Sequence, residues 1–172
     1  MDRVNEATKD CFDAIIQLRH AEASQIPQPA TLNHNLRTIV DEVQRRAAIL
    51  GFSHHDAQDM VYALVALLDE VVLSKPEPYR QFWMGHLLQL HYFKETVAGD
   101  GFFDRLNTIR KDPHRVEILR VYYLCLLFGF GWTVLAWDYS MTLSLHFQST
   151  MYGWQVFMGG WVVVLMTFSM IL

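Results

Sequence analysis

Charged residues are distributed very unevenly along this chain of 172 residues. All 14 Lys and Arg residues and all but one of the 18 Asp and Glu residues lie within residues 1–120, so Asp138 carries the only formal charge from Val121 to Leu172. The segment from Gly153 to Leu172, as a helix with a rise of about 1.5 Å per residue, is long enough to cross a hydrocarbon core of about 30 Å. The sequence therefore predicts a soluble part followed by a membrane span, with a buried core helix as the alternative for the apolar part.

The flanks of the charged part indicate on which side of a membrane it lies. The N-terminal stretch "MDRVNEATKDCF" contains no apolar core of signal-peptide length, so residues 1–120 are expected in the cytoplasm. Basic residues just before the apolar part favour the same side under the positive-inside rule. The net charge of −4 leaves no basic excess, which argues against nucleic acid as a partner. The flanking basic residues are Arg110, Lys111, Arg115 and Arg120.

Apolar residues recur at three- and four-residue spacing through the charged part, as they do on one face of an α-helix. No stretch alternates with a period of two, and there is no hairpin signal. These patterns predict an all-helical bundle for residues 1–130 and a separate apolar segment for residues 131–172. Helices are expected at about 3–25, 31–50, 54–73, 79–97 and 102–112, and from Pro113 onward.

The third of these helices contains the feature that most concerns function. Ser53 is expected to cap it, and its apolar run from Met60 to Leu68 covers the whole circumference, which predicts the central helix of the bundle. The run ends at two carboxylates, Asp69 and Glu70, whose burial without partners would cost several kcal/mol. Either they cap a neighbouring helix or pair with an arginine, or they form an acidic patch that binds a basic or amide-rich protein partner.

Other patterns give little support for catalysis or for a cofactor. His54 and His55 are adjacent, so on a helix they point about 100° apart and are expected to be solvated rather than metal ligands. Cys11 and Cys125 are expected to be structural thiols without a disulfide. There is no phosphate-binding loop, and no serine or cysteine has an evident base beside it. The sequence therefore predicts no catalytic residue, metal site or cofactor.

Three segments together resemble the DotU/TssL family of bacterial secretion proteins. The resemblance covers about residues 1–130 and is specific in combination. It includes the Leu-Asp-Glu after a Tyr-Ala-Leu, the Ala-Gly-x-Gly-Phe-Phe and the Tyr-Tyr-Leu-Cys-Leu-x-x-Gly-Phe. The segments are "GFSHHDAQDMVYALVALLDEVVL", "FWMGHLLQLHYFKETVAGDGFFDRL" and "DPHRVEILRVYYLCLLFGF".

This resemblance implies a non-enzymatic subunit of a type VI secretion envelope complex. It implies two small packed helical bundles in the cytoplasm, anchored in the bacterial inner membrane by one C-terminal transmembrane helix. The implied partners are a TssM/IcmF-like inner-membrane protein, an outer-membrane lipoprotein and baseplate proteins, besides membrane lipid and a second copy of the chain. The family's cytoplasmic cleft carboxylates correspond to Asp69 and Glu70 here.

The segment after Phe130 departs from that family. Residues 131–160 are similar to part of a membrane subunit of the quinol:cytochrome c oxidoreductase called alternative complex III. This second resemblance implies a fusion, either natural or produced by a gene-model or assembly error. It also implies, as the alternative function, a fragment of a membrane redox complex, although the remainder of a quinol site is absent from the chain. The matching residues are Asp138, Met141, Leu143, His146, Ser149, Thr150 and Gly153.

Overall fold

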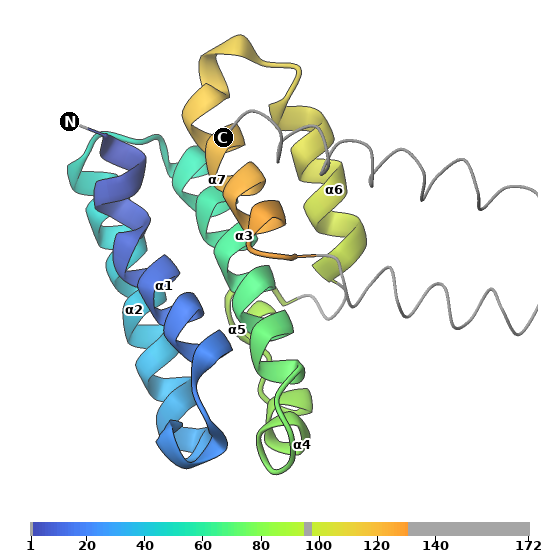
Figure 1. Ribbon diagram of the computed structural model, residues 1–172. Helices are drawn as coiled ribbons and strands as arrows, with labels where there is room; N and C mark the ends of the chain where they lie inside the picture. The colour runs from blue at the N-terminus through green and yellow to red at the C-terminus, as the bar shows by residue number, and fades with distance from the viewer. Residues whose placement is uncertain (1, 95–97, 131–172) are drawn as a thin grey trace, which may run out of the picture. The chain divides into compact units, whose positions relative to one another are not determined.

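The computed structural model describes residues 2–94 and 98–130 (Figure 1). These residues form α-helices joined by short turns and two 3-10 segments, and no strand occurs among them. The all-helical prediction is therefore confirmed for this part of the chain. The helices are α1 (Arg3–His20), α2 (Pro29–Ile49), α3 (His54–Leu73), α4 (Tyr79–Met84), α5 (Leu88–Phe93), α6 (Ala98–Ile109) and α7 (Val116–Leu127), and the 3-10 segments are Ala23–Gln25 and Pro113–Arg115.

The first three helices begin at local sequence signals, and α2 also ends at one. Asp2 caps α1 by accepting a hydrogen bond from the backbone N–H of Asn5 at 3.3 Å. Pro29 occupies the first turn of α2, where its missing N–H has no intrahelical partner to lose. Gly51 follows α2 with a φ of +78°, a left-handed conformation that glycine adopts without strain. Ser53 Oγ then accepts the N–H of Asp56 at 3.0 Å, so the predicted cap of α3 is confirmed.

Helix α3 lies at the centre of the bundle, as its sequence predicted. It packs against α1, α2, α4, α5, α6 and α7, and Figure 1 shows α1 and α2 running side by side with α3 next to them. Every residue from Met60 to Leu68 is buried. A helix that is apolar on all sides must be covered on all sides, and the surrounding helices supply that cover.

The single helix predicted for residues 79–97 is wrong. Helix α4 ends at Met84, and α5 begins only at Leu88. The backbone N–H groups of Leu88 and Gln89 donate to the side chain of Asp69 in α3 instead of continuing a helical ladder from α4. The resulting turn changes which residues of this segment face inward, and Leu90 is 40% exposed.

The start of α6 and the start of α7 also differ from the prediction. The stretch "AGDG" is not a break between helices. It forms the first turn of α6, which begins at Ala98 rather than at the predicted residue 102. Its glycines lie in the first turn, where the backbone N–H groups need no intrahelical partner and low helix propensity costs little. Pro113 begins a 3-10 segment rather than an α-helix, and α7 follows it from Val116.

Across residues 2–94 and 98–130, no helix combines the length and the hydrophobicity that a bilayer crossing requires. The predicted membrane segment, residues 131–172, lies outside the described residues. The segment that resembles alternative complex III lies there as well.

Candidate functional site

Asp69 is buried at the C-terminal end of the apolar run of α3 and caps the neighbouring helix α5. Its side chain is 4% exposed. Oδ1 accepts hydrogen bonds from the indole N–H of Trp83 at 2.7 Å and from the backbone N–H of Leu88 at 2.9 Å, while Oδ2 accepts the backbone N–H of Gln89 at 2.9 Å. One of the two structural alternatives, that a carboxylate here caps a neighbouring helix, is thus confirmed for Asp69.

The surroundings of Asp69 also set its protonation. Burial raises the pKa of this carboxyl from its usual 3.8 to about 6, although the three N–H donors favour the charged form and act in the opposite direction. The donors are neutral groups, so they satisfy the oxygens without supplying a compensating charge. Asp69 is therefore fixed in place by its hydrogen bonds and holds α4 and α5 against α3.

Glu70, the next residue, faces a different environment. It is half-buried and lines an open cleft with a volume of about 570 Å³. The cleft is formed where the end of α1, the end of α3 and the end of α7 meet. The structure therefore separates the two predicted site residues: only Glu70 is among those that line the cleft. The lining residues are Arg19, Glu70, Val71, Ser74, Lys75, Leu127, Phe128 and Gly129.

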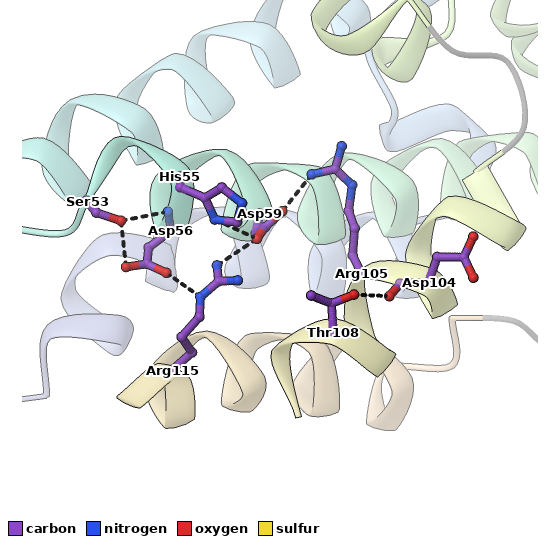
Figure 2. A network of polar contacts seen from close by, with 8 residues as sticks. All are labelled: Ser53, His55, Asp56, Asp59, Asp104, Arg105, Thr108 and Arg115. Atoms are coloured by element: carbon purple, nitrogen blue, oxygen red, sulfur yellow. Dashed lines mark hydrogen bonds and ion pairs between the residues drawn. The ribbon is translucent and has the colours of Figure 1, made fainter. Parts of the chain in front are cut away.

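A second buried carboxylate, Asp59, lies at the N-terminal end of the same apolar run (Figure 2). Its oxygens accept hydrogen bonds from Arg105 of α6 at 2.6 Å and from Arg115 before α7 at 2.6 Å. His55 Nδ1 lies 3.2 Å from the carboxylate, and Arg115 also donates to Asp56 at 2.8 Å. These contacts join α3 to both helices of the C-terminal half of the described region.

The sequence reasoning missed Asp59. The signal was the same as for Asp69, namely a carboxylate next to a run that is apolar on all sides. The arginine pairing considered for Asp69 and Glu70 occurs at Asp59, whose partners lie 46 and 56 residues away along the chain. The guanidinium of Arg105 also stacks over the ring of Tyr62, with 4.1 Å from Cζ to the ring centroid.

The other side chains that could react or bind a metal, the histidines and cysteines singled out from the sequence, are either exposed to solvent or packed in the core. His54 and His55 are exposed, as predicted. Cys11 and Cys125 are buried free thiols, also as predicted. Burial raises the pKa of Cys11 to about 12, so this thiol is not a nucleophile at neutral pH. In the described part of the chain, no group of three or more His, Cys, Asp or Glu side chains is arranged to hold a metal ion.

The fold and the site define a class of protein. This is a helical domain with two internally satisfied carboxylates that fix its helices, and with an open, charge-lined cleft on its surface. The chain belongs to the DotU family, described as "Type VI secretion system protein DotU", which matches residues 4–131. The resemblance drawn from the sequence over residues 1–130 is thereby confirmed.

Two solved structures are similar to this chain. One is the crystal structure of SciP/TssL of the type VI secretion system from enteroaggregative Escherichia coli 042, which is 27% identical with a TM-score of 0.67 and covers 76% of this chain and 75% of its own. The other is the cytoplasmic domain of TssL from Acinetobacter baumannii, which is 28% identical with a TM-score of 0.67 and covers 74% of this chain and 81% of its own. A comparison with curated proteins gives no match.

Proposed function

We propose that the chain is a structural and docking subunit of a type VI secretion envelope complex, where it links the inner membrane to baseplate components. Membership of the DotU family over residues 4–131 and the similarity to TssL structures support this role. The observation that carries the docking role is the open cleft of about 570 Å³ beside Glu70. Pockets that bind small ligands in proteins have volumes of roughly 300–1,000 Å³, and this cleft lies within that range.

The two predicted partner-binding residues take different parts in this proposal. Glu70 lines the cleft and contacts the partner directly. Asp69 acts as a positioning residue, because its oxygens already accept three hydrogen bonds and its side chain is buried. The partners proposed for the cleft are baseplate proteins, while a TssM/IcmF-like inner-membrane protein and an outer-membrane lipoprotein complete the envelope complex.

Affinity purification of the full chain from its own cells tests the docking role. The variant Glu70→Ala is expected to recover less baseplate protein than the wild type, with unchanged helix content in far-UV circular dichroism. Asp104→Ala serves as the matched control, because Asp104 is an exposed carboxylate on α6 that does not line the cleft. Equal recovery with Glu70→Ala and with the control would mean that the cleft carboxylate contacts no partner.

Asp69→Ala gives a different readout in the same experiment. Removal of this carboxylate leaves buried N–H groups of Trp83, Leu88 and Gln89 without acceptors, at about 1–3 kcal/mol each. Any loss of partner is therefore expected together with a lower unfolding temperature, whereas Glu70→Ala is expected to lose partner alone. The two single variants therefore distinguish a residue that contacts the partner, Glu70, from one that positions the helices, Asp69. A variant with both substitutions would not distinguish these roles.

The proposed placement puts residues 1–130 in the cytoplasm and residues 131–172 in the inner membrane. It is supported by composition, because Asp138 is the only formal charge after position 120. The full chain is expected to stay in the membrane fraction after an alkaline carbonate wash. A tag at the N-terminus is expected to be digested by protease in inside-out vesicles and protected in intact spheroplasts. Extraction by carbonate would contradict the anchor, and digestion in spheroplasts would contradict the orientation.

A further inference from the structure

The cleft beside Glu70 contains more positive charge than negative charge. Arg19, at the end of α1, and Lys75, just after α3, both line it. The Lys75 Nζ donates to the backbone carbonyl of Arg19 at 3.4 Å, which holds these two segments together. Burial, and then the charge of Arg19, lower the pKa of Lys75. Two cations thus share one cleft with a single carboxylate among the described lining residues, and the charge of Arg19 disfavours that of Lys75.

Arg19 and Lys75 form no ion pair with a carboxylate within residues 2–94 and 98–130, and both line the cleft. Arg37, Arg80, Arg110, Lys94 and Lys111 likewise form no ion pair there, but they lie outside the cleft. The remaining described arginines pair with a carboxylate on the protein itself. Those that do so are Arg3, Arg45, Arg46, Arg105, Arg115 and Arg120.

The cleft also has apolar lining residues. Leu127 is 82% exposed, and it lies beside Phe128, whose ring stacks on Phe12 at 5.2 Å between centroids. The cleft therefore combines cationic and apolar lining residues.

We propose that the cleft binds a segment of a protein partner that carries an acidic side chain next to an apolar one, with Arg19 and Lys75 as the residues that recognise the acid. This proposal rests on the docking role of the same cleft and specifies the chemistry of its partner. The acidic side chain lies between the two cations and relieves their mutual repulsion, while the apolar side chain packs on Leu127. Glu70 accepts N–H groups of the same segment, which agrees with the amide-rich partner expected from the sequence.

An anionic lipid headgroup offers a similar charge but fits the cleft less well. A phosphate placed between the two cations would also face the carboxylate of Glu70, which lines the same surface. A carboxylate of a peptide placed there faces Glu70 in the same way, but the peptide also supplies backbone N–H donors for Glu70, which a lipid phosphate does not. The mixed charge of the cleft thus favours a polypeptide over a membrane surface.

The test uses the full chain purified in mild detergent, with the baseplate proteins of the same secretion system as the probe. The variant Arg19→Gln/Lys75→Gln is expected to bind them about tenfold more weakly than the wild type, and Glu70→Gln only a few-fold more weakly. The wild-type affinity is also expected to fall between about 50 and about 300 mM salt, and the double variant to lose most of this dependence. Lys9→Gln/Arg45→Gln is the matched control, because it removes the same charge from exposed positions outside the cleft.

The outcomes separate this inference from the docking role. If the cleft and control double variants bind equally while Glu70→Gln abolishes binding, docking stands and the assignment of Arg19 and Lys75 is overturned. If the wild type binds no baseplate protein, the docking role fails and the inference fails with it. Vesicles with about 30% phosphatidylglycerol form the third arm. If the cleft variant loses vesicle binding and retains baseplate binding, the recognised anion is a lipid, which also overturns the proposal.

Discussion

The indole Nε1 of Trp83 lies 2.7 Å from Oδ1 of Asp69, and both side chains are buried between α3 and α4. This contact is the side-chain part of a three-donor arrangement in which the other two donors are backbone N–H groups at the start of α5. Asp69 therefore joins three helices through one carboxylate. Because of this contact, a substitution at Trp83 is expected to alter the pKa of Asp69, a carboxyl that is buried from solvent.

Trp83→Phe is expected to raise the pKa of Asp69 further and to lower stability by about 1–3 kcal/mol, because it removes a hydrogen bond that favours the charged carboxylate and retains the ring. Selective ¹³C labelling of aspartate side chains in the full chain would report this pKa by NMR. Tyr79→Phe is the control, because it removes a hydrogen bond to the carbonyl of Ile26 at 2.9 Å, a neutral acceptor. An Asp69 that titrates alike in both variants would contradict the proposed coupling.

Asp69 also predicts a pH dependence of stability whose sign is unusual for a carboxylate. With a folded pKa of about 6 and an unfolded value of 3.8, the folded state retains a proton between these values that the unfolded state has released. The contribution of this group is therefore fully present below about pH 4 and is lost as pH rises to about 6, by about 3 kcal/mol. Denaturant unfolding of the wild type and Asp69→Asn, compared from pH 4 to 7, measures it. The stability of the wild type minus that of Asp69→Asn is expected to fall as pH rises, and a constant value of this difference from pH 4 to 7 would refute the raised pKa.

The sequence was sufficient for α2, for α3 and for the start of α1 because their determinants are local. The predicted end of α1 at about residue 25 was wrong, because α1 ends at His20 and a separate 3-10 segment covers Ala23–Gln25. Ser53 caps α3 through a residue three positions away, and the apolar run that follows identifies the central helix by itself. The break between α4 and α5 was not predictable in this way. It depends on Asp69, which accepts N–H groups 19 and 20 residues further along the chain. A pattern read within one helix contains no information about such a distant acceptor.

The same contrast between local and distant determinants explains which residues of the candidate site could be predicted from the sequence. Glu70 was identified because it follows an apolar run directly. The cations Arg19 and Lys75 were not, because the cleft assembles them from separate elements. Asp59 was missed although its burial required partners, since Arg105 and Arg115 cannot be assigned to it without the packing of α6 and α7 on α3.

Asp59→Asn is expected to destabilise the described domain by about 3–5 kcal/mol, because it removes the buried anion that Arg105 and Arg115 share. Among the described residues, Arg105 has no other carboxylate partner, whereas Arg115 retains its contact with Asp56 at 2.8 Å. Thermal unfolding followed by far-UV circular dichroism measures the loss. The control Arg120→Gln removes an exposed pair with Asp2 and is expected to cause a much smaller change. Equal losses would show that burial adds nothing to the Asp59 pairs.

Two glycines that flank different helices provide a test of backbone conformation alone. Gly51 has a φ of +78° and open space around the position of an added Cβ, so Gly51→Ala is expected to cost about 1–2 kcal/mol through the left-handed backbone only. Gly85 has a φ of −93°, and an added Cβ would lie 3.8 Å from the carbonyl oxygen of Phe82, an ordinary contact. Gly85→Ala is therefore expected to be neutral or slightly stabilising. Urea unfolding measures the free energy of unfolding of both variants. A larger loss of stability with Gly85→Ala than with Gly51→Ala would contradict the assignment of the cost to the left-handed backbone at Gly51.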